Sequence, residues 1–249
     1  MAKTATSDVV WAGLAEYLQD LVLNSSDVEV FLRELAVCSA ERLSGTDREI
    51  YCGITLVRRK RSITIASSDE TARELDEQQA RYGDGPCLTA IRENRPVLVP
   101  DADAEIRWPE YMAAVREHGL RSILGVPFAL DGAAEASLNV YSGSAHTLSG
   151  PMIERAEEYV LRASKALNLS VRMAQLTEAR DNLKAAMESR TTIDLAVGVI
   201  MGQNRCSQDT AFEILRKASS ARNVKLREIA ATIVAGVNQG REAETRFDE

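Results

Sequence analysis

Apolar positions in the first two thirds of the chain alternate between helical and strand-like spacing. Helical spacing predicts helices over residues 8–23 and 27–43, the second introduced by the capping-box sequence Ser26-Asp-Val-Glu29. Two β-branched runs at 50–57 and 62–67 flank the basic turn 58–61 and predict a hairpin. Four clustered cations in a turn are usually solvated, so this turn is not expected to bind nucleic acid.

Three more strands are expected at residues 97–100, 122–130 and 136–142. Helices are expected near 69–82, 86–93 and 108–118. The predicted fold class is therefore α+β: residues 1–150 form an antiparallel sheet flanked by helices, with an N-terminal helix in front.

A long helix is predicted next, because residues 152–190 contain neither glycine nor proline. Its later part carries a heptad seam that is interrupted by Arg180 and consists of Leu169, Met173, Leu176, Leu183 and Met187. This spacing predicts a coiled-coil linker over 151–189 and a homodimer. The alternative is an ordinary amphipathic helix packed on its own domain.

Three short helical stripes follow in residues 190–238 and predict a small three-helix domain. Ser207 is expected to cap the second helix, and Asn223 the third, at its start. Gly198, which costs about 1 kcal/mol in a helix interior, is expected to allow close packing beside Ala196 and Ala211. Met201 and Phe212 are expected in the core, and the polar tail 239–249 is expected to be disordered.

Positive charge concentrates in the same small domain. Residues 190–235 contain seven lysines and arginines but four acids, whereas the whole chain has 30 of the former against 37 of the latter and a net charge of −7. An acidic protein binds a polyanion only through such a local patch.

The motifs of this region resemble the ANTAR domain: R-x-x-I-D-x-A-x-G-x-I-M at 190–201, S-x-x-x-A-F-x-x-L-R-x-x-S at 207–219 and N-x-K-L at 223–226. The resemblance implies a dimer that binds paired RNA stem-loops in nascent transcripts and prevents transcription termination. The candidate RNA-binding residues are Arg190, Arg205, Arg216, Lys217, Ser219, Arg222, Asn223 and Lys225.

The N-terminal region resembles a GAF domain over about 27–148, through Y-G-D-G-P-C-L-T-A-I at 82–91, G-L-R-S-I-L-G-V-P at 119–127 and S-L-N-V-Y at 137–141. GAF domains are sensory modules, so the resemblance implies a small-molecule ligand without identifying it, and any cofactor stays unknown. The candidate sensory-pocket residues are Tyr82, Cys87, Trp108, Phe128, Asn139 and Tyr141.

Neither catalysis nor a metal site is expected. The phosphate-cradling, nucleophile-elbow and zinc-protease motifs are absent, and the two histidines, His118 and His146, are not in metal-ligand spacing. The four cysteines are far apart, which supports neither zinc nor a disulfide framework. No run of about 20 apolar residues exists, so the chain is expected to be cytoplasmic rather than membrane-bound.

The sequence therefore predicts a signal-responsive antitermination regulator that is not an enzyme. Two alternatives stay open. Residues 207–236 also fit the outline of a DNA-binding helix-turn-helix. A dimeric signalling scaffold that binds no nucleic acid is the other.

Overall fold

The computed structural model describes residues 11, 13–45, 49–58, 62–132 and 134–238. The chain divides into two compact units, residues 1–175 and 176–249, and each is described by itself. The expected tail 239–249, residues 8–10 of the first expected helix and residues 59–61 of the basic turn lie outside the described residues.

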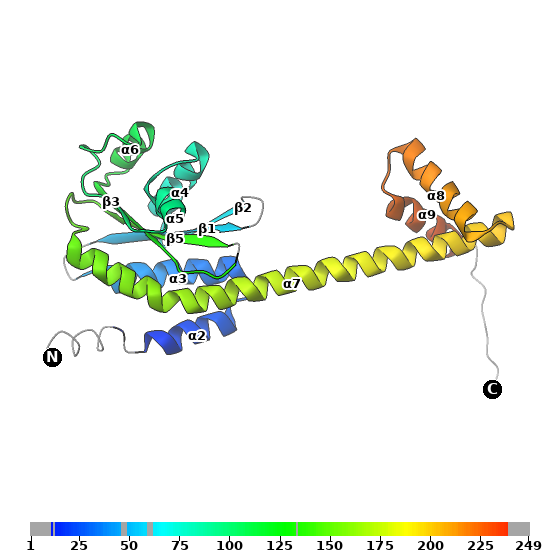
Figure 1. The fold of residues 1–249 in the computed structure, drawn as a ribbon, viewed down its shortest axis with the longest axis horizontal. Helices are drawn as coiled ribbons and strands as arrows, with labels where there is room; N and C mark the ends of the chain where they lie inside the picture. The colour runs from blue at the N-terminus through cyan, green and yellow to red at the C-terminus, as the bar shows by residue number, and fades with distance from the viewer. Residues whose placement is uncertain (1–10, 12, 46–48, 59–61, 133, 239–249) are drawn as a thin grey trace. The chain divides into compact units, whose positions relative to one another are not determined.

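The first unit is built on a five-stranded antiparallel sheet with the order β2-β1-β5-β4-β3 (Figure 1). Its strands are β1 (Ile50–Arg58), β2 (Ser62–Ser67), β3 (Val97–Val99), β4 (Ser122–Pro127) and β5 (Glu135–Ser142). The predicted hairpin is confirmed, because Arg58 pairs with Ser62 at its end. The central strand β5 pairs with both β1 and β4, and Asn139 lies opposite Gly53 and Gly125.

Strand β4 is shorter than the expected 122–130. The Phe128 amide still donates to the Ala136 carbonyl at 2.8 Å. The amides of Ala129 and Asp131 instead donate to the side chains of Ser164 and Asn168 on the following long helix, at 3.1 and 2.9 Å. The chain leaves the sheet there because its next donors are satisfied elsewhere.

Edge strand β3 is the shortest of the five. It holds three residues and lies between Pro96 and Pro100 in the sequence. Proline has no backbone N–H to donate to a strand ladder, so the two prolines mark where pairing with β4 stops.

Helices cover both faces of the sheet (Figure 1). One face packs against α3 (Val28–Leu43) and the first part of α7 (Gly150–Asn204), and α2 (Leu14–Asn24) lies outside these helices, in contact with α3. The other packs against α4 (Glu70–Tyr82), α5 (Pro86–Glu93) and α6 (Pro109–Glu117). Alternate strand residues divide between the two cores, Leu138 and Val140 facing one and Tyr141 the other. The predicted α+β class is confirmed.

Asp27, not Ser26, caps α3. One carboxylate oxygen of Asp27 accepts the amides of Glu29 and Val30, both at 2.9 Å, while the Ser26 hydroxyl donates to the other oxygen. The expected capping box is therefore wrong by one residue. Either residue type can cap a helix, and the carboxylate accepts two amides at once, which a charged acceptor does strongly.

Helix α7 runs unbroken for 55 residues. It includes the stretch that was expected as a separate short helix near 193–201, because no proline or capping sequence interrupts it there. In the first unit it buries a stripe of apolar side chains, and the Tyr159 hydroxyl accepts from Ser39 on α3 at 3.0 Å. This part is therefore an amphipathic helix packed on its own domain. Among the described residues, no helix combines the length and apolarity needed to cross a bilayer.

The second unit packs the end of α7 against α8 (Gln208–Arg222) and α9 (Leu226–Asn238). Its buried residues are Ala196, Val197, Ile200, Ala211, Leu215, Ile229 and Ala230. Ser207 caps α8 as predicted, accepting from the Thr210 amide at 3.3 Å. Met201 packs against the core, but Phe212 is 40% exposed, so its predicted burial is wrong.

Asn223 ends α8 rather than starting the next helix. It has a φ of 50°, in the left-handed region that asparagine tolerates, and α9 begins only at Leu226. The predicted N-cap is thus a C-cap.

Gly198 does not serve the expected close packing. A Cβ placed on it would meet nothing within 4 Å, while Ala196 and Ala211 are fully buried as expected.

We expect Gly198→Ala to stabilise the second unit by about 0.5–1 kcal/mol, because alanine favours the helix. Gly202→Ala, at another open position of α7, is the matched control for thermal unfolding. A lower unfolding temperature for Gly198→Ala alone would show that the bare backbone is needed.

Candidate functional site

Two of the candidate RNA-binding cations already have an acidic neighbour. Arg216 donates to both carboxylate oxygens of Glu213, one turn earlier on α8, at 2.8 and 3.1 Å. This contact raises the pKa of Arg216 and lowers that of Glu213. Arg190 lies 3.8 Å from Asp194 on α7. Part of their charge is therefore balanced within the protein.

Other cations are exposed and make no ion pair with described residues. Lys217 and Arg222 lie in the last turns of α8, and Lys225 follows in the turn to α9. The C-terminal end of a helix presents carbonyl groups, which favour positive charge nearby. These three residues lie within nine positions of one another at the end of α8, and we call them the α8 patch; their charge is available to an external anion.

Ser219 and Asn223 shape the turn beside the α8 patch. The Ser219 hydroxyl donates to the Val224 carbonyl at 2.6 Å, and the Val224 amide donates back to the Ser219 carbonyl at 3.2 Å. Together with the left-handed Asn223, these bonds fix the path between Arg222 and Lys225. In the structure both residues position the turn, and their contact with RNA stays a prediction.

The eight candidate residues do not form one cluster. Arg190 and Arg205 are 15 residues apart along α7 and its end, which at about 1.5 Å per residue separates them by roughly 22 Å. Arg205 adopts a left-handed φ of 51° directly after the helix. A ligand that touches both must extend over several nucleotides.

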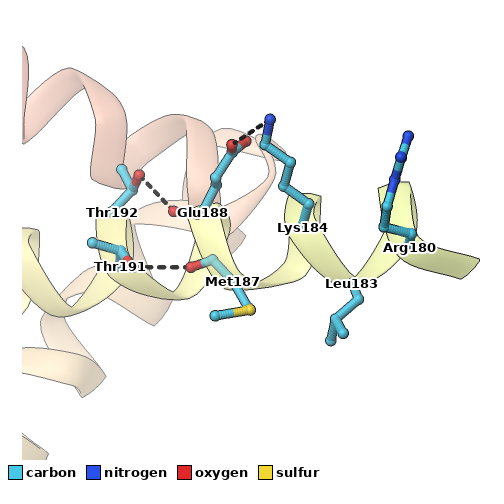
Figure 2. A pocket seen from close by; sticks show the side chains of 7 residues that line it. All are labelled: Arg180, Leu183, Lys184, Met187, Glu188, Thr191 and Thr192. Atoms are coloured by element: carbon cyan, nitrogen blue, oxygen red, sulfur yellow. Dashed lines mark hydrogen bonds and ion pairs between the residues drawn. The ribbon is translucent and has the colours of Figure 1, made fainter.

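The α7 face ahead of these cations carries unpartnered apolar side chains. Figure 2 shows Leu183 and Met187 projecting from one side of the helix, away from the Lys184–Glu188 ion pair of 3.9 Å. Leu183 is 63% exposed and Met187 is 61% exposed. Leu176, one heptad earlier, is exposed as well, and Arg180 between them pairs with Asp181 at 2.9 Å. An apolar seam flanked by i,i+4 ion pairs is typical of a coiled-coil surface.

Inside the first unit, a buried polar network joins α4 to the sheet. The Asp76 carboxylate of α4 accepts from the Asn139 amide at 2.7 Å and from the Tyr141 hydroxyl, both on β5. Asn139 also donates to the Thr55 hydroxyl at 2.9 Å, and the hydroxyls of Tyr141 and Tyr111 lie 3.3 Å apart. All five side chains are buried.

The structure divides the candidate sensory-pocket residues. Asn139 and Tyr141 belong to the Asp76 network, and Cys87 and Trp108 lie in the core on the same side of the sheet. Phe128 lies in the core on the opposite face, where it continues the alternation of Leu124 and Val126 along β4. Tyr82 ends α4 and is 49% exposed. Phe128 and Tyr82 therefore do not join the other four.

Cys87 is a buried thiol at the start of α5. Burial raises its pKa, and the nearby charge of Asp76 adds to this effect. Its backbone amide donates to the Gln79 side chain at 2.9 Å. The environment opposes the thiolate that redox chemistry needs.

Asp76 is the main residue that the sequence analysis missed. Ala72, Leu75, Asp76 and Gln79 are the buried residues of α4. An aspartate within the apolar stripe of an otherwise polar helix is the signal that could have identified it, because a buried acid requires partners.

Comparisons with known proteins match both parts of the chain. A family model described as GAF domain matches residues 25–168, and one described as ANTAR domain matches residues 181–234. No curated protein matches the chain significantly.

Solved structures resemble the first part at low identity. The N-acylhomoserine lactone dependent LuxR family transcription factor CepR2 from Burkholderia cenocepacia aligns at 16% identity and a TM-score of 0.49, over 65% of this chain and 96% of that one. Free methionine-R-sulfoxide reductase from Neisseria meningitidis aligns at 19% and 0.45, over 64% and 89%. The GAF domain of a phosphoenolpyruvate-protein phosphotransferase from Coxiella burnetii aligns at 16% and 0.46, over 66% and 94%. Likeness at this level carries no information on function.

Proposed function

Because the chain belongs to the GAF–ANTAR regulatory proteins, with a GAF domain over 25–168 and an ANTAR domain over 181–234, we propose that it is a signal-responsive transcription antitermination regulator. In this proposal it binds paired RNA stem-loops as a dimer, in the cytoplasm, and performs binding rather than catalysis. The GAF domain receives the signal.

The observation that carries this proposal is the α8 patch. Lys217, Arg222 and Lys225 are exposed and form no ion pair within the described chain, although acids outnumber bases overall. Exposed cations without an acidic partner can neutralise the phosphates of a nucleic acid, which releases counterions and favours binding. The cations would position the RNA backbone, while base edges supply sequence specificity.

Dimerisation is supported by the exposed seam of α7. Leu176, Leu183 and Met187 follow heptad spacing and are exposed, with no apolar partner among the described residues of their own unit. A second copy of the helix would bury them. Two ANTAR domains in one dimer would then bind two stem-loops, and a GAF ligand could control RNA affinity only by binding one dimer geometry more tightly than another.

The test compares RNA and DNA binding in the wild type and in a Lys217→Ala/Arg222→Ala/Lys225→Ala variant. We expect the wild type to bind a tandem stem-loop RNA in preference to duplex DNA. The variant should bind RNA more weakly, and the slope of log K against log salt should become shallower by about two to three. Fluorescence anisotropy over a salt series measures both quantities.

The matched control removes three exposed cations from the first unit, Arg33→Ala/Arg81→Ala/Arg95→Ala. It changes net charge equally and should leave the salt slope unaltered. Preference for duplex DNA would favour the helix-turn-helix alternative. Binding to neither nucleic acid would leave a dimeric scaffold as the better account.

A further inference from the structure

The Asp76 carboxyl is only partly satisfied by its surroundings. The residue is 1% exposed, and one of its oxygens accepts from Asn139 and Tyr141. The other oxygen, Oδ2, is buried without a hydrogen-bond partner, and so is the nearby Ser67 hydroxyl on β2. A buried carboxylate oxygen without a donor is costly when it is charged.

Among the described residues, no cation compensates this carboxylate. The polar and titratable groups that face it come from every element packed against it, and none is positively charged. They are Asp69 at the start of α4, Thr55 on β1, Ser67 on β2, Cys87 on α5, Tyr111 on α6, and Asn139 and Tyr141 on β5. Asp69 adds a second negative charge to the neighbourhood.

The backbone of β1 fills the space in front of Oδ2. A Cβ placed on Gly53 would come within 1.7 Å of Oδ2 and 3.4 Å of the Ser67 oxygen. A glycine is therefore needed at position 53, where α4 meets β1. Any molecule large enough to donate to Oδ2 would have to displace either the helix or the strand. The Ser67 hydroxyl lies near enough to favour the ionised form, but it makes no hydrogen bond of normal geometry to Oδ2. A proton satisfies this oxygen without occupying volume.

We propose that Asp76 is a proton-binding site through which the GAF domain responds to pH. In the protonated form, the carboxyl is neutral and gains a hydroxyl that can donate to the unpartnered Ser67 oxygen. In the ionised form, an uncompensated charge remains between α4 and the sheet and weakens their packing. Asn139 and Tyr141 transmit this change to the central strand β5.

The electrostatics agree with this geometry. Burial raises the pKa of Asp76 to about 7, against the opposing effect of hydrogen bonds from Tyr141 and Asn139 and of the Ser67 hydroxyl. Because the folded-state pKa lies above the unfolded value of 3.8, the contribution to stability is complete below that value. This contribution is lost as pH rises from 3.8 to about 7, and over that range the unfolding equilibrium constant should grow by up to about tenfold per pH unit. Above the folded-state pKa the stability contribution changes no further.

The first test is a carboxyl-carbon NMR titration of the full-length protein with labelled aspartate. We expect one resonance, absent from Asp76→Asn, to titrate near pH 7, well above the value of about 3.9 for an unperturbed aspartate. Tyr141→Phe removes a hydrogen bond to the ionised form and should raise the midpoint further, which tests the assignment if Asp76→Asn does not fold. A midpoint below about pH 5 in the wild type would overturn the proposal.

The second test concerns the response. Hydrogen exchange of α4 should be faster at about pH 8 than at about pH 6 after correction for intrinsic rates, and Asp76→Asn should abolish the difference. The same pH dependence in both proteins would overturn the switch.

RNA affinity measured at the two pH values links the switch to output, and this arm rests on the proposed function. A pH-dependent affinity in the wild type alone supports the coupling, whereas equal dependence in Asp76→Asn refutes it. Failure to bind RNA at either pH would contradict the proposed function only, and the carboxyl titration would still decide the proton site.

Discussion

Replacing Leu183 and Met187 with glutamate should turn a dimer into a monomer and weaken binding to a tandem stem-loop RNA on the order of 100-fold or more. Both side chains are more than half exposed on the seam of α7, so their loss costs the isolated chain little. In a two-stranded coiled coil they would be buried, and like charges would face one another. The tandem RNA loses affinity because two linked sites bind far more tightly than one.

Analytical ultracentrifugation and binding to single and tandem stem-loops measure this effect. Affinity for a single stem-loop should stay near the wild-type value. The control Asn182→Glu/Ala185→Glu adds the same charges at exposed positions of the same helix away from the seam, and should stay dimeric. A monomeric wild type, or a dimer that survives Leu183→Glu/Met187→Glu, would contradict dimerisation through α7.

The second large effect is expected from Leu215→Ala. Leu215 is fully buried in the small core of the second unit, where three of the seven buried residues are alanines. Truncating a buried leucine costs about 2–5 kcal/mol, and a core of this size rarely supplies more than about 3–5 kcal/mol. We expect the ANTAR domain to be largely unfolded and RNA binding to be lost, while the GAF domain keeps its own unfolding transition.

Ile214→Ala is the matched control, because Ile214 is the next residue along α8 from Leu215 and its side chain is 41% exposed. It should cost about 1 kcal/mol or less and leave RNA binding intact. Circular dichroism and calorimetry separate the two transitions. A Leu215→Ala protein with wild-type RNA affinity would show that this core does not hold the binding surface together.

Local chemistry in the sequence predicted most of the fold. Alternating β-branched runs located the strands, and the absence of glycine and proline from residues 152–190 located most of α7. The boundaries that were wrong depended on distant partners. Residues 129–131 leave the sheet because the amides of Ala129 and Asp131 donate to Ser164 and Asn168 on α7. No local sequence pattern indicates these distant partners.

The site was less predictable than the fold. The concentration of cations identified the ANTAR region, but spacing could not show that Arg216 pairs with Glu213 whereas Lys217 pairs with no described acid. Asp76 was missed because its importance arises from Asn139 and Tyr141, more than 60 residues away in the chain. Exposure of Phe212 likewise depends on how three helices meet rather than on its position in one.

The short edge strand β3 bears on how the protein behaves when it is concentrated. An exposed sheet edge can act as a template on which another chain adds a strand, the first step of edge-to-edge aggregation. Val97–Val99 offers only three residues between two prolines, so an incoming strand would find almost no ladder to extend. The Arg107 guanidinium also donates to the Leu98 carbonyl at 3.0 Å, so the edge is protected against intermolecular β-pairing by its shortness and by a charged side chain.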